Sequence, residues 1–217
     1  MVRGFINPFD QYAGEYARWF ETSKGRILFQ IEVEAVKLVI GDVQPPFLEI
    51  GVGTGIFASV LQIGFGIDPS YKVSYIAKKK GILVALGKGE YLPFEDNTFG
   101  AVFILFTLCF VDDPINVLKE TYRSLRQGGK VILGFINKRS SWGQLYMGKK
   151  EEGNPFYLNV KFYDLDEIEE FLVNVGFKNM IYSSTLIQLP SENPCLEEPH
   201  RMLLPEAGFI CISGEKE

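Results

Sequence analysis

A short run of alternating glycines is the part of this sequence whose residue types and spacing most directly indicate chemistry. It follows the apolar run 47–50 and consists of Gly51-Val52-Gly53-Thr54-Gly55, before a helix that is expected to begin near Ile56. Glycines without Cβ atoms let a ligand approach the backbone at a turn between a buried strand and a helix. The run therefore predicts a site for a nucleotide-like cofactor, with an ordinary tight turn as the alternative.

The spacing of the glycines and one acidic neighbour indicate which cofactor binds there. A dinucleotide fingerprint, GxGxxG, requires glycine at position 56, where this chain has Ile56. Glu49 would repel a pyrophosphate but would attract a ligand that carries sulfonium and ammonium groups. S-adenosylmethionine carries both groups, so the sequence favours this methyl donor over NAD or FAD.

An acidic residue after the next expected strand fits the same cofactor. Asp68, followed by Pro69, lies about 17 residues after Gly51. That separation is near the spacing of roughly 20 residues at which a carboxylate accepts hydrogen bonds from ribose hydroxyls. We expect Asp68 to bind the ribose, with a turn aspartate before proline as the alternative role.

The elements that must position these residues alternate along the chain, which is typical of βαβ units that build a parallel sheet. Strands are expected at 47–50, 64–67, 82–86, 101–108, 131–136, 178–186 and 209–213. Helices are expected within 12–40, at about 56–62 and 74–80, from Pro114 to the glycine pair 128–129, and at 165–175 before Gly176. The N-terminal helices and residues 138–161 remain as covers over the sheet.

Length, composition and charge limit the class of protein. The 217 residues, 47% of them hydrophobic, can bury one full core, and the net charge of -5 gives no basic field to hold nucleic acid. Cys109, Cys195 and Cys211 are too widely spaced for a disulfide framework or a metal or redox pair. With no apolar signal core or membrane-length apolar run, the sequence predicts a cytoplasmic protein that binds neither nucleic acid nor a membrane.

Several motifs, taken in order along the chain, resemble the class I S-adenosylmethionine-dependent methyltransferases. The resemblance is strongest to the group that includes ubiquinone and menaquinone biosynthesis methyltransferases (methyltransferase type 11). The motifs are FLEIGVGTG, IDPS, GEYLPFEDNTF and LRQGGKVILGF, which together cover most of residues 47–136. The later YDLDEIEEFLVNVGF is similar to the helix that leads into the closing antiparallel strands of this family.

The resemblance implies an α/β, doubly wound, three-layer Rossmann-like fold whose seven-stranded, mostly parallel sheet has the order 3-2-1-4-5-7-6. We expect a single methyltransferase domain over residues 1–217. Its expected parts are an N-terminal helical cover (1–44), a cofactor-binding core (45–136), a substrate-cap insertion (137–161) and a closing helix with antiparallel strands (162–217).

The resemblance also assigns parts of the cofactor to residues of this chain. It implies that the methionine moiety lies near Glu49, Gly51 and Gly53 and the adenine near Gly89 and Glu90. It also implies that the end of the fourth strand, around Phe106, approaches the cofactor. Tyr16 is a candidate for the methionine carboxylate, with Tyr12 and Arg26 as alternatives. The expected cofactor-binding set is completed by Val52, Gly55, Pro69 and Tyr91. Lys88 departs from the family pattern, which has an aspartate for the adenine amino group at this place.

The covers contain many aromatic residues, which predicts an apolar or aromatic small-molecule methyl acceptor. The alternative is that these rings only pack the cap against the sheet. The residues are Tyr12, Tyr16, Trp19, Trp142, Tyr146, Phe156 and Tyr157. The predicted reaction is in-line methyl transfer, in which positioning alone contributes roughly 7–11 kcal/mol.

No catalytic base and no metal are predicted. Relatives often carry histidine where this chain has Cys109 and Phe110, and His200, the only histidine, is expected at the surface of a proline-rich segment. Magnesium at Asp112 and Asp113 is less favoured than a helix-capping role for Asp113.

Two other functions stay open at this stage. Tyr146 and Lys150 form a YxxxK pair like that of NAD-dependent short-chain dehydrogenases, although residues 148–153 are expected to lie outside a clear helix. The other alternative is a catalytically silent protein that binds S-adenosylmethionine, since the family histidine is missing. The sequence does not predict the oligomeric state.

Overall fold

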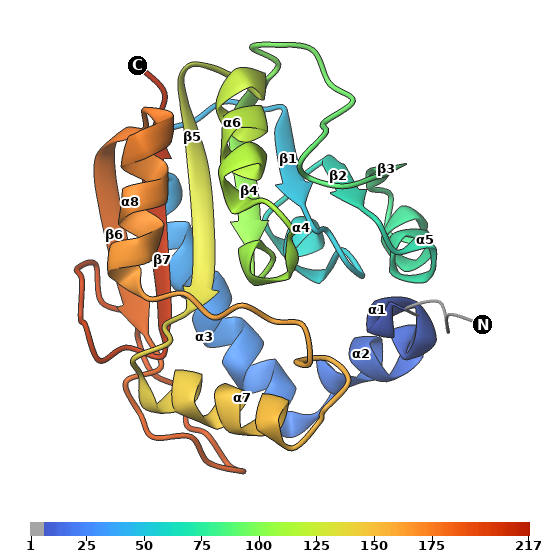
Figure 1. Ribbon diagram of the computed structural model, residues 1–217, viewed down its shortest axis with the longest axis vertical. Coiled ribbons are helices and arrows are strands. Elements are labelled where there is room, and N and C mark those ends of the chain that lie inside the picture. The colour runs from blue at the N-terminus through green and yellow to red at the C-terminus, as the bar shows by residue number, and fades with distance from the viewer. Residues whose placement is uncertain (1–6) are drawn as a thin grey trace.

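Seven strands form one sheet in the computed structural model of the protein, which describes residues 7–217 (Figure 1). They are β1 (Phe47–Ile50), β2 (Phe65–Asp68), β3 (Leu83–Leu86), β4 (Phe99–Leu105), β5 (Leu125–Ile136), β6 (Lys178–Thr185) and β7 (Phe209–Glu215). Their spatial order is β3-β2-β1-β4-β5-β7-β6, and only β7 runs antiparallel to its neighbours, β5 and β6. The predicted strand order and the mostly parallel α/β fold are confirmed.

Helices cover both faces of this sheet and bury one apolar cluster on each. The first cluster includes side chains of α3 (Ser23–Ile40), α4 (Ile56–Val60) and α5 (Tyr71–Lys79), and the second includes those of α6 (Pro114–Ser124) and α8 (Leu165–Val175). The central strand β4 contributes to both, because successive side chains of a strand point to opposite faces. Phe103 belongs to the first cluster, and Val102 and Ile104 belong to the second.

Three further helices form a cap beyond the carboxyl ends of the parallel strands (Figure 1). They are α1 (Pro8–Gln11), α2 (Ala13–Trp19) and α7 (Ser141–Glu151). Asp10 holds α1 against the start of α5, since its Oδ1 accepts hydrogen bonds from the Ser70 hydroxyl at 2.6 Å and from the Lys72 backbone N–H at 3.0 Å. Residues 1–6, the first part of the expected N-terminal cover, lie outside the described residues.

The prediction that residues 148–153 lie outside a clear helix was wrong, because α7 runs to Glu151. The Ser140 side chain caps this helix by accepting a hydrogen bond from the backbone N–H of Gly143 at 3.0 Å. Trp142 anchors it, since the ring is buried and its Nε1 donates to the carbonyl of Gln188 at 2.7 Å. Capping and this anchor outweigh the low helix propensity of the glycines.

Several element boundaries also differ from the prediction. Asp113 caps α6 as expected, accepting a hydrogen bond from the Asn116 N–H at 3.0 Å, but the helix ends at Ser124 and not at the glycine pair 128–129. The pair lies inside β5, at an irregularity in its pairing with β4. The fourth strand ends at Leu105 and not at Leu108, where a 3₁₀ turn, η1 (Leu108–Phe110), begins. No helix of the described residues is long and apolar enough to cross a membrane.

Candidate functional site

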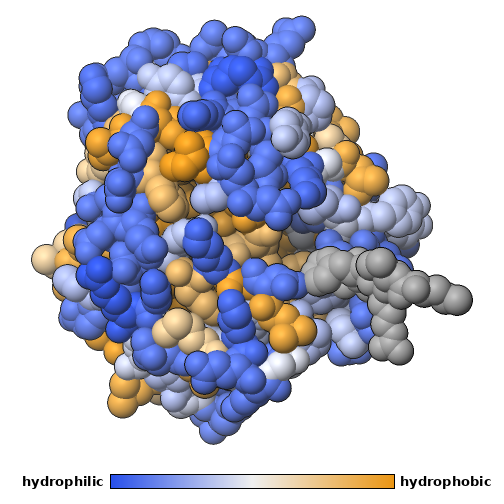
Figure 2. Space-filling model, in the orientation of Figure 1, coloured by the Kyte–Doolittle hydropathy of each residue, from blue (hydrophilic) through white to orange (hydrophobic). Residues whose placement is uncertain are grey.

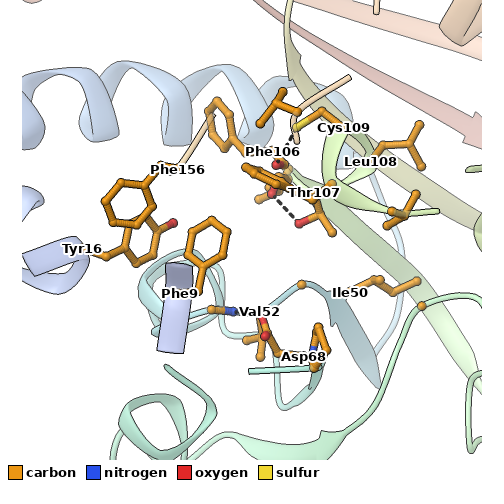
Figure 3. A pocket seen from close by; sticks show the side chains of 18 of the residues that line it. Phe9, Tyr16, Ile50, Val52, Asp68, Phe106, Thr107, Leu108, Cys109 and Phe156 are labelled. Carbon is orange, nitrogen blue, oxygen red and sulfur yellow. Dashed lines mark hydrogen bonds between the residues drawn. The ribbon is translucent and has the colours of Figure 1, made fainter. Parts of the chain in front are cut away.

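A cavity of about 1030 Å³ lies between the carboxyl ends of β1, β2 and β4 and the cap. Figure 3 shows Val52 and Asp68 on one side of it and the rings of Phe9, Tyr16 and Phe156 facing them. In Figure 2 apolar residues are visible within a hollow on a face that is otherwise mostly hydrophilic. Ligand cavities commonly measure about 300–1,000 Å³, so this one has room for a nucleoside-sized cofactor and a small acceptor together.

The turn after β1 places two of its three glycines at the cavity. Gly51 and Gly53 have φ angles of 72° and 51°, in the left-handed region that favours glycine. A Cβ atom on Gly51 would collide with Thr107, whereas one on Gly53 would point toward Tyr16, 3.7 Å from its Cε1. Gly55 is different: it starts α4, a Cβ there would collide with Ile82, and it does not line the cavity. Packing against the core therefore requires glycine at position 55.

Asp68, at the end of β2, is buried beside this turn. Its Oδ2 accepts a hydrogen bond from the Gly53 N–H at 2.9 Å, and its Oδ1 accepts one from the Ser70 N–H at 2.8 Å. Burial, together with the nearby Asp10 carboxylate, raises the pKa of Asp68, while these two backbone N–H groups oppose the shift. Each carboxylate oxygen can accept a second hydrogen bond, so Asp68 retains acceptor capacity for a ligand hydroxyl.

Glu49, on β1, places a carboxyl group without a complete set of partners under the glycine turn. It is 2% exposed, and its Oε2 has no hydrogen-bond partner among the described residues. Burial raises the pKa of Glu49 well above its usual range, with a further rise from Asp68, whereas a backbone hydrogen bond with Ala58 opposes the change. A buried carboxyl group with an unused oxygen fits a cationic ligand group, such as the ammonium of a bound amino acid moiety.

Gly89 and Glu90, predicted for the adenine, and their neighbours in the predicted cofactor set differ in where they lie. Gly89 and Pro69 line the cavity, and so does Glu90. The Glu90 Oε1, however, accepts a hydrogen bond from the Asp112 N–H at 3.0 Å, so this side chain supports the loop before α6. Tyr91 does not line the cavity, and its side chain is 77% exposed. Lys88 lines the cavity but pairs with Asp112 at 2.7 Å.

The end of β4 brings Phe106 to the cavity in a conformation that is uncommon for a bulky residue. Its φ angle is 56°, and its ring stacks on Phe209 with centroids 5.0 Å apart. Strained backbone of this kind clusters at ligand sites. Cys109 lies next to it and donates to the Phe106 carbonyl at 3.3 Å, and burial raises the pKa of its thiol to about 12. Cys109 therefore stays a neutral thiol near pH 7.

Tyr16, on α2, closes the cavity over Gly53. Burial, together with the Asp68 and Glu49 carboxyl groups, raises the pKa of its phenol, so Tyr16 stays neutral and can donate a hydrogen bond. Of the other aromatic residues predicted for the acceptor, those lining the cavity are Trp19, Tyr146, Phe156 and Tyr157. Tyr12 and Trp142 do not line it.

Other predicted candidates lie away from the cavity. Arg26 and His200 are exposed and do not line it. Lys150 donates to the carbonyl of Val160 at 2.7 Å, so its ammonium group is committed to a structural contact. No group of three or more His, Cys, Asp or Glu residues arranged to hold a metal ion occurs between residues 7 and 217.

Two residues that the sequence did not single out also line the cavity, Phe9 on α1 and Glu32 on α3. Glu32 lies within the helical stretch 12–40 that was expected to serve as a cover over the sheet. It follows Leu28 by four residues and precedes Val36 by four, so it lies on the apolar face of the helix. A charged residue on an apolar helix face was the signal that could have identified it.

The strand order with antiparallel β7, the glycine turn after β1 and the acidic residue at the end of β2 together define the class of Rossmann-like S-adenosylmethionine-dependent methyltransferases. Residues 48–133 match the family model described as a methyltransferase domain. The chain belongs to the class I S-adenosylmethionine-dependent methyltransferases of the type 11 group, as its motifs predicted, and S-adenosylmethionine is its cofactor.

Its relatives share nearly the whole chain. A crystal structure from Thermotoga maritima, described as an S-adenosylmethionine-dependent methyltransferase and possible histamine N-methyltransferase, is 36% identical with a TM-score of 0.89, covering 96% of this chain and 98% of that one. An uncharacterized protein from Methanocaldococcus jannaschii is 38% identical to this chain, and the match covers 97% of this chain and 100% of the relative. An uncharacterized protein from Mycobacterium tuberculosis is 39% identical, and the match covers 93% of this chain and 71% of the relative.

Proposed function

We propose that the protein transfers the methyl group of S-adenosylmethionine to a small molecule that binds in the same cavity, under the cap. The observation that carries this proposal is that one cavity is lined both by Gly53 and Asp68 and by the rings of Phe156 and Tyr157. The cap covers the strand ends, which favours a small acceptor over a macromolecule. The net charge of -5 supports an acceptor other than nucleic acid, and the unpaired cysteines support a cytoplasmic location.

The residues present fit this cofactor at three of its groups. The unused oxygen of Glu49 suits the ammonium, and Asp68 suits the ribose hydroxyls. The backbone of Gly51 and Gly53, which carry no Cβ, lets the ligand lie against the main chain. We assign the methionine carboxylate to the Tyr16 hydroxyl, and the remaining contacts to Val52, Pro69, Gly89 and Phe106. Glu90 completes the cavity wall through the loop that it holds.

The bound cofactor supplies a sulfonium-activated methyl group for in-line displacement by a nucleophilic atom of the acceptor. The contribution of the chain is to orient the two molecules and exclude water. Phe9 supports this cover, since its ring packs edge to face against Tyr16, Phe110 and Phe156, with centroids 5.2 to 5.6 Å away. We further propose that residues 137–161 act as the acceptor cap of a single domain, over the core formed by 45–136.

Incubation with labelled S-adenosylmethionine and a panel of quinones, phenols, amines and carboxylates tests the proposal. Histamine belongs in the panel because of the description of the Thermotoga maritima relative. We expect label transfer to at least one member and its loss in Asp68→Ala. Binding of the cofactor without turnover of any member would instead support a catalytically silent binding protein. Consumption of NADH by the protein would support the dehydrogenase alternative.

A further inference from the structure

Glu32 is a buried carboxyl group at the end of the cavity that Tyr16, Tyr146 and Tyr157 line, and the proposed cofactor contacts do not use it. It is 6% exposed and lines the cavity, and no side chain or backbone group of residues 7–217 forms a hydrogen bond or ion pair with it. Glu34, two residues later on α3, is exposed and pairs with Lys37 at 2.7 Å. Burying an unpaired carboxyl group is costly, so its position inside a ligand cavity points to a ligand partner.

Aromatic rings surround this end of the cavity. Tyr146 and Tyr157 lie with ring centroids 5.2 Å apart, and Tyr16 and Phe156 with centroids 6.2 Å apart. Glu32 is close enough to raise the pKa of Tyr16, Tyr146 and Tyr157, although burial is the larger cause for all three. Aromatic faces attract cations, and a carboxylate next to them strengthens that preference.

The charges along the cavity wall favour the same kind of ligand. Lys88 is the one lysine or arginine among the lining residues of the described chain, and Asp112 already pairs with it. Of the acidic lining residues, Glu15 and Asp112 are exposed and Glu90 holds the loop before α6. Glu49 and Asp68, next to the glycine turn, belong to the proposed cofactor contacts. Glu32 therefore remains as an acid without a counter-charge.

We propose that Glu32 binds a protonated nitrogen of the methyl acceptor, so that the acceptor is a small amine with an apolar or aromatic body. This ammonium nitrogen has no lone pair and serves as an anchor, so the methyl group passes to another nucleophilic atom of the acceptor. This inference rests on the proposed function, because it places the acceptor in the cavity beside the cofactor. The body of the amine lies among the aromatic rings, and its cationic end reaches α3. Acceptors that carry a carboxylate or phosphate at this end are disfavoured, because Glu32 would repel them.

Calorimetry on protein saturated with S-adenosylhomocysteine tests this inference with matched pairs of probes. The amines are 2-phenylethylamine, tyramine, tryptamine and histamine, each compared with the alcohol that replaces its amino group. We expect at least one amine to bind about ten-fold or more tightly than its alcohol, which corresponds to roughly 1.4 kcal/mol. Glu32→Gln should abolish this preference while the affinity for S-adenosylhomocysteine stays within about two-fold.

Two further variants separate a binding role from a structural one. Glu34→Gln removes an exposed carboxylate from the same helix and should keep the amine preference of the unmodified protein. Glu32→Asp keeps the charge and should retain part of the preference, which covers the case in which Glu32→Gln folds poorly. The inference is overturned if no amine is preferred over its alcohol or if Glu32→Gln keeps the preference. Methylation of an uncharged acceptor by the same protein would overturn it without affecting the proposed function.

Discussion

Asp68 connects the parts of the cofactor site, because its carboxylate joins the glycine turn to the start of α5. Asp68→Ala removes the acceptor proposed for the ribose hydroxyls and the support of the Gly53 N–H. We expect the affinity for S-adenosylmethionine to fall by roughly 1.5–3 kcal/mol, the scale of hydrogen bonds to a charged group. Calorimetry checks this, with the thermal midpoint as a control for folding. An unchanged affinity would exclude Asp68 from the site.

Glu32 should make the folded protein less stable as the pH rises. Burial raises its pKa well above 4.5, so the folded state binds this proton more tightly than the unfolded state does. The stabilisation is fully present below pH 4.5 and is lost as the pH rises toward the raised pKa. Glu32→Gln removes this titrating group, so it should favour the folded state more at pH 8 than at pH 4.5. We expect the change in the free energy of unfolding that the substitution causes to be higher at pH 8 by about 1 kcal/mol or more. Urea denaturation at both pH values measures the difference, and an equal effect at both would contradict the account.

Local motifs were sufficient to identify many of the residues that line the cavity but not the direction of each side chain. The glycine turn, Glu49 and Asp68 are close in sequence to strands whose ends meet at one edge of the sheet. Gly55 and Tyr91 belong to the same motifs, yet one is packed against the core and the other faces solvent. Glu32 reaches the cavity through the tertiary placement of α3, which no local pattern specifies.

At the scale of elements, α1 is a four-residue part of the cap that contacts α5. Asp10 fixes it to the start of α5, and Phe9 packs it into the aromatic cluster. Asp10→Ala should loosen this cover and speed the dissociation of S-adenosylhomocysteine several-fold, with a loss of stability of about 1 kcal/mol. Stopped-flow fluorescence of Trp19, which lines the cavity, measures the rate. Asp42→Ala, at an exposed residue outside the cavity, should leave it unchanged. Equal rates for both variants would show that the Asp10 anchor does not hold the cover.

Element types were more predictable from sequence than their ends. The capping residue Asp113, the helix Leu165–Val175 and its closing glycine, Gly176, follow from local chemistry. The glycine pair 128–129 did not reveal its role, because such a pair suits both a helix end and an irregularity in a strand. Its place inside β5 depends on pairing with β4, which is distant in sequence. The helix α7 depends in the same way on the distant contact between Trp142 and Gln188.

For the whole molecule, alternation of strands and helices predicted an α/β sheet, but the strand order came from the resemblance to a family. Order depends on crossovers between distant segments, as in the insertion of β7 between β5 and β6. Because the cavity is built from several of these elements, ligand binding should stabilise the entire fold. At 100 times its Kd, S-adenosylhomocysteine should contribute about 2.7 kcal/mol and raise Tm by roughly 5–10 °C. Differential scanning calorimetry checks this, with NAD as a control that should leave Tm unchanged. A rise with NAD alone would favour the dehydrogenase.

The central claim is that the turn after β1 is free of side chains on its cavity side so that S-adenosylmethionine can lie against the backbone. The most direct measurement is a crystal structure of the protein grown with saturating S-adenosylhomocysteine. The account predicts electron density along Gly51 and Gly53, with the amino group at Glu49 and the ribose at Asp68. Density for the ligand at another place, or none at saturation, would contradict it.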